Sequence, residues 1–328
     1  MPQPTASDVH YSRPLTNISV AYLQSLDTFI ASKVFPVVPV SKQGNRYTTY
    51  EKSYWNRIVA QKRTPATASA GGGYGVNNDN SYYCDVWALH KDVDDETRAN
   101  SDDQINPDRD ATEYVSRNLM LAKENDWTSA YFTTGIWTGD QTGVSSGPST
   151  NEFLQWNDAS STPIKNIQDQ LDIVQQRTGF RPNKLVLGPQ VFTALKDNPD
   201  ILDRIKYSQR GVITRDILAM LFEVDEVLVP YGIYTTTDEG VVEASQEYSF
   251  FFGKAALLIY AAPNPGLLIP SGGYTFAWTG LLGASAMGHR MTTFRMKELK
   301  ADRVEGEMAF DQKVIAADLG VFFVSAVA

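Results

Sequence analysis

A cluster of glycines is the first feature of this sequence that could support chemistry, because glycine-rich loops can bind phosphate through their backbone amides. The cluster is Gly71-Gly72-Gly73-Tyr74-Gly75. A phosphate-binding loop follows a strand and opens a helix, and a P-loop also ends in Gly-Lys before a Ser or Thr. Here residues 76–79 read Val-Asn-Asn-Asp, and no helix pattern begins. Residues 64–80 have almost nothing to bury, so we interpret them as a flexible tip.

Acidic side chains gather between Asp92 and Asp103, where six carboxylates could attract a divalent cation. Their spacing does not match an EF-hand loop, which needs a central glycine and a Glu at its twelfth position. We interpret them as a solvated acidic face or as a partner for cations on another subunit. The three histidines are far apart in sequence, and Cys84 lies in a strand-like run that indicates a small buried side chain. The sequence therefore predicts no catalytic residue, no metal site, no cofactor and no enzymatic activity.

The composition is that of an ordinary globular protein, with 42% hydrophobic and 20% charged residues among 328. This length suggests about two domains. No apolar run reaches the roughly 18 residues of a membrane span, and the N-terminus lacks a secretory pattern. A single cysteine excludes an intrachain disulfide and fits a reducing compartment. The net charge of −9 argues against wrapping nucleic acid, since phosphate binding needs a basic surface.

The charge is unevenly distributed along the chain. Residues 1–70 contain eight basic and three acidic residues, whereas residues 85–126 contain five basic and twelve acidic residues. Oppositely charged regions of this kind can direct one surface onto another, within a chain or between chains.

The elements that would position these side chains begin with an N-terminal arm at residues 1–45. Its prolines keep the ends from being helical, while Val20, Leu23, Leu26 and Ile30 recur at helical spacing. Residues 35–40, FPVVPV, favour a strand at the edge of a sheet.

Residues 46–93 are predicted to form a long two-stranded excursion with aromatic sides. Both of its sides contain aromatic and β-branched residues, which favour strands. We expect this ribbon to need a covering partner, because exposed apolar strands are a liability for a monomer.

A long helix is predicted over residues 107–131. Asn106 caps it, Pro107 starts it, and Asp108 and Asp110 lie in its first turn. Its apolar stripe is predicted to consist of Ala111, Val115, Leu119 and Ala122. Its charged residues, including Lys123 and Glu124, are predicted to face solvent.

The second half of the chain begins after a Gly- and Ser-rich connection at residues 135–162. A helix is predicted from Pro163 to a stop at Gly179. Residues 183–230 read as strand, helix, helix, helix and strand, with caps at Asn198 and Thr214. The tail from residue 290 onward reads as long strands.

This order of parts resembles the major capsid proteins of tailed bacteriophages, over nearly the whole chain. The stretches that carry the resemblance are FPVVPV followed by NRYTTY, NPDRDATEYVSRNLMLAKENDW, and NKLVLGPQVFTALKDNPDILDRIKYSQRGVITRDILAMLFEVDEVLV. The resemblance implies an α+β protein with the Hong Kong 97-type capsid fold. It implies an N-terminal arm at 1–45, an extended β-ribbon loop at 46–93, a peripheral domain at 94–162 with its spine helix, an axial α/β domain at 163–265, and strands at 266–328 that return to the peripheral domain.

The implied function is self-assembly into pentamers and hexamers of an icosahedral head shell around double-stranded DNA. The expected partners are the chain itself, a separate scaffolding protein, a portal and a decoration protein. Assembly is expected in the host bacterial cytoplasm, and the chain is expected in the virion capsid. The sequence leaves three alternatives open: an encapsulated-nanocompartment shell, another phage structural subunit, and an enzyme that binds a phosphorylated ligand near Gly71.

A specific contact between subunits is predicted from the charge distribution. The basic ribbon is expected to rest on the acidic region of an adjacent subunit. Reversing the charge at Arg57 and Lys62 should therefore impair the assembly of shells. The predicted contact residues are Arg46, Arg57, Lys62 and Arg63 for charge, Tyr47, Tyr50, Trp55 and Trp87 for apolar area, and Asp92, Asp94, Asp95, Glu96, Asp108, Asp110 and Glu113 on the acidic side.

Overall fold

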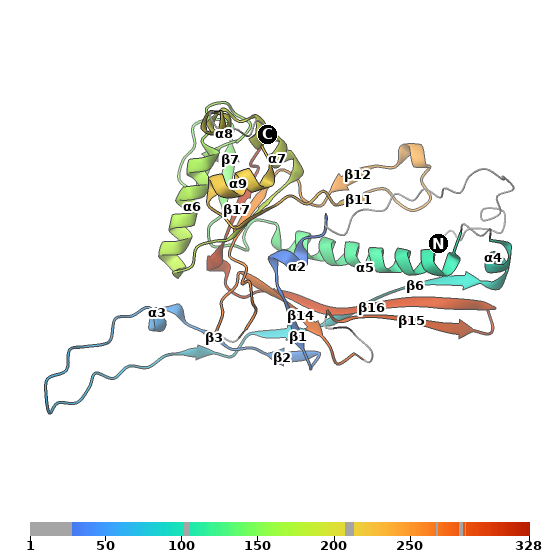
Figure 1. Ribbon diagram of the computed structural model, residues 1–328, viewed down its shortest axis with the longest axis horizontal. Helices are drawn as coiled ribbons and strands as arrows, with labels where there is room; N and C mark the ends of the chain where they lie inside the picture. The colour runs from blue at the N-terminus through green and yellow to red at the C-terminus, as the bar shows by residue number, and fades with distance from the viewer. Residues whose placement is uncertain (1–27, 102–104, 207–212, 267, 282–284, 286) are drawn as a thin grey trace.

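The helices and strands of this chain are organised around two sheets, as the ribbon in Figure 1 shows. The computed structural model describes residues 28–101, 105–206, 213–266, 268–281, 285 and 287–328. The predicted arm helix falls mostly in residues 1–27 and so lies outside the described residues. Within them, the arm supplies the short helix α2, Ala31–Val34, which is preceded by the buried Ile30.

The first sheet, called the long sheet below, has the order β1-β14-β16-β15, and β6 also pairs with β16. Its strands are β1 (Val37–Val40), β6 (Asp85–Asp94), β14 (Gly273–Trp278), β15 (His289–Met296) and β16 (Ala301–Val314). β1 lies at an edge and runs parallel to β14, which confirms the edge strand expected from FPVVPV. Two segments from the first third of the chain are thus held by strands from its last fifth.

The second sheet, called the six-stranded sheet below, has the order β10-β9-β13-β17-β7-β8. Its strands are β7 (Gln141–Val144), β8 (Glu152–Leu154), β9 (Lys184–Leu187), β10 (Glu226–Leu228), β13 (Ala256–Ile259) and β17 (Gly320–Val324). Four helices accompany it: α6 (Pro163–Thr178), α7 (Pro189–Asp197), α8 (Pro199–Ile205) and α9 (Arg215–Phe222). Side chains from these helices and strands form one buried cluster that includes Leu171, Leu195 and Phe222.

The predicted caps are present at the ends of the helices around the six-stranded sheet. The Asn198 side chain accepts a hydrogen bond from the Asp200 amide at the start of α8, and the Thr214 hydroxyl accepts one from the Ile217 amide in α9. Gly179 ends α6 with φ of 80°, a left-handed conformation that glycine adopts without strain. These contacts confirm the predicted series of strand, three helices and strand.

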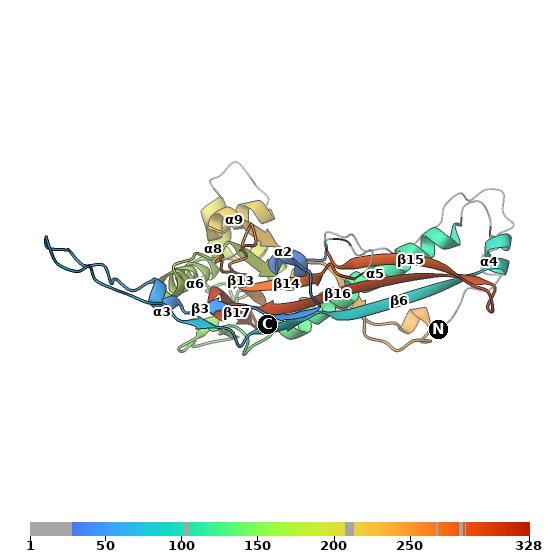
Figure 2. The ribbon, with the colours of Figure 1, turned by 90° about the horizontal axis from the view of Figure 1, so that it is seen from below.

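The long helix α5 spans Pro107–Tyr131, as the sequence predicted. Figures 1 and 2 show that it runs along the long sheet. Val115 and Leu119 pack there on Met308 and Phe310 of β16. The last turns of α5 instead bury Trp127 against Phe35 and Phe252.

Two narrow excursions leave this body in opposite directions (Figure 1). The first, called the ribbon below, runs from residue 44 to residue 83 and contains β2 (Gly44–Arg46), β3 (Thr49–Tyr50), α3 (Lys52–Trp55), β4 (Val76–Asn77) and β5 (Ser81–Tyr83). The second, called the hairpin below, pairs β11 (Ile233–Thr235) with β12 (Tyr248–Phe250) and has η2 (Glu243–Ser245) near its tip. The short helix α4 (Asp95–Asn100) follows β6, and η3 (Ala317–Leu319) precedes β17.

Three of the predicted boundaries need correction. The extended loop is shorter than 46–93, because β6 is a full strand of the long sheet. The strands at 141–154 and at 320–324 join the six-stranded sheet, and not the units predicted at 94–162 and 266–328. For β17 the physical reason is visible in its sequence: GVFFV is apolar without alternation, which is typical of a central strand covered on both faces.

Candidate assembly surfaces

The distal ribbon, residues 51–75, exposes apolar side chains that the subunit does not cover. Trp55 is 57% exposed, Tyr74 65% and Ile58 95%. The Trp55 and Tyr74 rings lie 5.6 Å apart, and Tyr50 lies 5.9 Å from Trp55, so the aromatic residues form one group. A contiguous exposed apolar surface of this kind marks an interaction site.

The four predicted basic contact residues are all exposed on the same ribbon: Arg46, Arg57, Lys62 and Arg63. The Arg57 guanidinium lies 5.8 Å from the Tyr54 ring centre, and Arg63 Nε donates to the Thr67 carbonyl at 2.8 Å. Nearer the body, the Lys52 ammonium is paired with the Asp318 carboxylate. The tip therefore combines cationic and aromatic groups.

Two of the four predicted aromatic contact residues pack on rings of the long sheet. Tyr47 lies 5.5 Å from Phe276, and Trp87 stacks on Phe310 at 6.0 Å. Tyr50 and Trp55 instead pack on each other and on Tyr74 within the ribbon; Trp55 is 57% exposed, whereas Tyr50 and Trp87 are 41% and 38% exposed. The structure thus separates an anchored base of the ribbon from its uncovered tip, a distinction that the aromatic composition did not predict.

The predicted acidic residues lie on β6, α4 and the start of α5, and most of them have partners in the same subunit. Arg303 donates to both carboxylate oxygens of Asp92, at 2.7 and 2.9 Å, which holds the pKa of Asp92 below its usual value. Asp94 caps α4 by accepting the Thr97 amide at 2.8 Å.

The remaining carboxylates of this group follow the same pattern. Arg295 bonds Asp95 at 2.6 Å and Arg98 bonds Asp108 at 2.6 Å. The exposed pairs on α5 join Arg109 to Asp110 and Arg117 to Glu113. Glu96 is exposed. Contact of these residues with another subunit stays a prediction, and the structure shows that their charge is largely balanced within the chain.

Lys123 and Glu124 on α5 are buried, contrary to the prediction that they face solvent. The Glu124 carboxylate accepts the Ile30 amide at 2.9 Å and the Ala31 amide at 3.0 Å, so it caps the N-terminus of α2. Lys123 Nζ donates to Ser32 Oγ at 2.9 Å. Helical periodicity alone could not reveal this, because the groups that bond Lys123 and Glu124 lie in the arm, more than 90 residues earlier in the sequence.

Burial sets the protonation of this pair. It raises the pKa of Glu124 to about 7, against the two amide hydrogen bonds, and it lowers the pKa of Lys123 to about 8. The junction between the arm and α5 is therefore sensitive to pH near neutrality.

Replacing Glu124 by Gln is expected to remove part of the pH dependence of stability. Because the pKa of Glu124 is raised on folding, the stability due to its protonation is fully present below about 4.5 and is lost as the pH rises through about 7. The free energy of unfolding of the unaltered subunit, relative to Glu124→Gln, should therefore fall by about 2–3 kcal/mol between pH 4.5 and 8. Denaturant unfolding of unassembled subunits at several pH values measures this difference.

The matched control is Glu113→Gln, which changes an exposed carboxylate on the same helix. Its stability difference from the unaltered chain should stay nearly constant with pH. A constant difference for Glu124→Gln as well would contradict the role given to the buried carboxyl.

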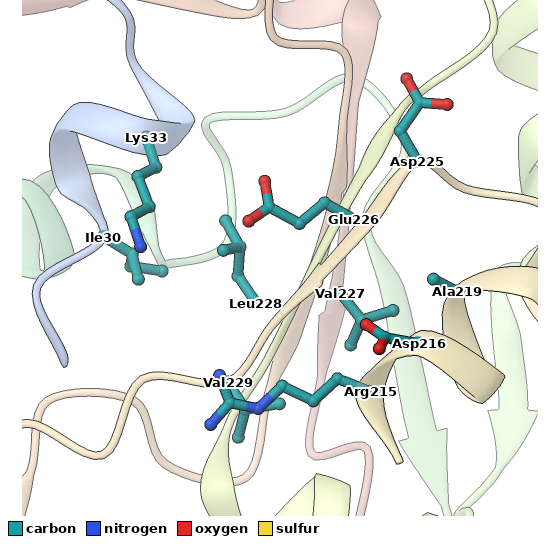
Figure 3. Close-up of a pocket in the computed structure, with 10 residues that line it drawn as sticks. All are labelled: Ile30, Lys33, Arg215, Asp216, Ala219, Asp225, Glu226, Val227, Leu228 and Val229. Atoms are coloured by element: carbon teal, nitrogen blue, oxygen red, sulfur yellow. The ribbon is translucent and has the colours of Figure 1, made fainter. Parts of the chain in front are cut away.

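A pocket of about 280 Å³ lies where α2 meets β10 and α9. Figure 3 shows its charged side chains, which include Lys33, Arg215 and Glu226, spread along the walls. Its lining contains the carboxylates of Asp216, Asp225 and Glu226 and the ammonium of Lys33, but no Ser, Cys or His side chain. Within the described part of the chain, no three His, Cys, Asp or Glu side chains are grouped to hold a metal ion. No described helix has the length and apolarity to cross a bilayer.

Two curated proteins match more than nine tenths of the chain. The major capsid protein of Burkholderia phage BcepMu is 22% identical over 313 residues, which are 93% of each chain. The major capsid protein of Pseudomonas phage JBD67 is 26% identical over 322 residues, which are 96% of each chain. No family model matches the sequence.

Solved structures with 10 to 22% sequence identity share the architecture. A phage-related protein from Bordetella bronchiseptica superposes with a TM-score of 0.68 at 22% identity, covering 92% of this chain and 93% of its own. The capsid of cyanophage P-SCSP1u gives 0.59 at 10% identity, covering 97% and 93%. An encapsulin complex from Synechococcus elongatus gives 0.52 at 11% identity, covering 95% and 93%. With its ribbon, long helix and two sheets, this chain has the α+β fold of tailed-phage capsid proteins, and its sequence is similar to phage major capsid proteins over more than nine tenths of its length.

Proposed function

We propose that this chain is the major capsid protein of a tailed bacteriophage, which self-assembles into the icosahedral head shell around double-stranded DNA. The observation that carries this function is the match to two major capsid proteins over more than nine tenths of the chain. The uncovered ribbon supports it, because other copies of the subunit can bury Trp55, Ile58 and Tyr74.

The parts of the subunit are assigned roles within that function. The body around the six-stranded sheet serves as the axial domain near the centre of each pentamer or hexamer. The long sheet with α5 serves as the peripheral domain and its spine helix. The ribbon serves as the extended loop that lies across a neighbouring subunit. The strand pairing supports these assignments, and we include β7, β8 and β17 in the axial domain because they belong to the six-stranded sheet.

The partners follow from the same function. They are further copies of the chain, a separate scaffolding protein, a portal and a decoration protein, with assembly in the host cytoplasm and the product in the virion. The role is structural and not enzymatic. An acidic chain with net charge −9 suits a wall that must release its genome, because a basic wall would bind phosphate.

An encapsulated-nanocompartment shell is the second candidate, since the encapsulin likeness extends over 95% of this chain. That likeness concerns the fold, whereas both curated relatives are phage proteins. The contents of native particles distinguish the two functions: a phage head encloses DNA, and a compartment encloses protein.

Electron microscopy of the purified chain tests the proposal. Closed shells, or rings of five and six subunits, are the expected result. Tubes or fibres would instead indicate a tail component, and a stable monomer that turns over a phosphorylated ligand would indicate an enzyme. Repeating the microscopy over a series of protein concentrations, from dilute to assembly conditions, shows whether assembly depends on the concentration of the chain.

A further inference from the structure

The hairpin formed by β11 and β12 is a second uncovered surface, and its charge is entirely negative. Residues 233–250 contain four carboxylates and no Lys or Arg: Asp238, Glu239, Glu243 and Glu247. All four are exposed, and none has an ion-pair partner among the described residues. Apolar side chains are exposed beside them: Val242 at 72% and Tyr248 at 59%.

The ribbon tip, which here means residues 52–78, has the opposite charge. It contains four basic residues and no carboxylate. Lys52 is bound to Asp318, which leaves Arg57, Lys62 and Arg63 exposed and without an ion-pair partner among the described residues. These cations stand beside the exposed Trp55 and Tyr74.

The acidic face on β6, α4 and α5 is a poorer partner for this tip. Two of its carboxylates, Asp92 and Asp95, already accept charge-assisted hydrogen bonds from Arg303 and Arg295 of the same subunit. A cation from another subunit would compete with these bonds and gain little. The hairpin carboxylates have no such in-chain competitor among the described residues.

The directions of the two excursions prevent them from meeting within one subunit. In Figure 1 the ribbon extends to one side of the body, whereas the hairpin extends to the other side, above α5. A contact between them therefore joins different copies, head to tail. Head-to-tail contacts between identical subunits generate rings when the rotation closes.

We propose that the ribbon tip of one subunit binds the hairpin of a neighbouring copy, with Arg57, Lys62 and Arg63 facing Asp238, Glu239, Glu243 and Glu247. This inference rests on the proposed shell function and names the surface that receives the ribbon. Each exposed ion pair adds at most about 1 kcal/mol. The charges therefore set direction and register, and the aromatic and aliphatic side chains supply buried area.

A charge swap in the full chain tests the contact. Lys62→Glu with Arg63→Glu reverses the charge of two side chains on the ribbon, and Glu239→Lys with Glu243→Lys reverses the charge of two side chains on the hairpin. Each reversal alone should lower the yield of sedimenting shells about tenfold at low salt, because like charges then face each other. The combined variant should recover to within about threefold of the unaltered chain, as coupling between contacting sites requires.

The matched control combines the reversed ribbon with Glu96→Lys and Glu113→Lys on the acidic face. It should assemble as poorly as the reversed ribbon alone. Rescue by the acidic face, or no rescue by the hairpin, would overturn the proposal. Absence of both shells and rings of five or six subunits from the unaltered chain would contradict the shell function itself, so the two failures are distinguishable.

A thiol cross-link gives a second readout that does not depend on charge. Lys62→Cys and Glu239→Cys, in one chain, are joined in assembled shells with a short bismaleimide. The native Cys84 is fully buried and should not react. A ladder of linked species ending at closed rings is the expected result. Shells that yield only unlinked subunits would refute the contact.

Discussion

A subunit in which Tyr50 is joined to Val76 by an Asn-Gly turn should fold normally and form no shells. Tyr50 and Val76 are register partners in the β3–β4 pair, so a two-residue turn can close the shortened hairpin there. The deletion removes residues 51–75, nearly all of them exposed, including Trp55, Ile58 and Tyr74. Assembly is measured by sedimentation and microscopy, and folding by circular dichroism.

The control for this deletion removes only residues 65–71 at the tip, which are exposed and contain no aromatic or charged side chain. Shells should form from this variant at a yield close to normal. If the chain without residues 51–75 also assembled, the ribbon could not be the principal contact between subunits. If it failed to fold, the tip would have a structural role that its exposure does not predict.

Replacing Gly306 by Val should strongly destabilise the subunit, because the new side chain would clash where α5 packs on the long sheet. A Cβ at Gly306 would lie 2.5 Å from Val115 Cγ1, 2.8 Å from Leu119 Cδ1 and 2.8 Å from Met291 Sδ. The absence of a side chain there lets α5 approach β16 closely. Overpacking such a site costs about 3 kcal/mol, which denaturant unfolding of the subunit measures.

The matched control is Gly71→Val at the ribbon tip, where an added Cβ meets nothing within 4 Å. This change should leave the free energy of unfolding within about 0.5 kcal/mol of normal. Equal stability of Gly306→Val and Gly71→Val would show that α5 can move away from the sheet without cost. The packing of Val115 and Leu119 on β16 would then not define the position of the helix.

The sequence predicted best those elements whose ends carry their own chemical signals. Asn106 with Pro107, and Asn198 with Pro199, locate α5 and α8 because capping is a local interaction. The apolar sequence of β17 indicates a central strand, but it does not indicate which sheet, because that depends on distant pairing with β13 and β7.

The candidate surfaces could be predicted only in part. The aromatic residues along the ribbon correctly indicated an exposed apolar surface, since Trp55 is 57% exposed. The same composition could not separate Trp55 from Tyr47, because Tyr47 packs on Phe276, more than 200 residues away. Glu124 resembled a solvent-facing helix residue for the same reason. Its partners are amides of the arm, and no spacing within α5 reveals them.

The pairing of early and late strands in the long sheet has a consequence for synthesis on the ribosome. β1 pairs with residues 275–278, and β6 pairs with residues 301–310, so neither finds its neighbour until most of the polypeptide has been translated. A nascent chain therefore presents no finished platform for α5. Polymerisation on polysomes is disfavoured by the order in which the strands emerge, and each subunit becomes competent to join a shell only after release.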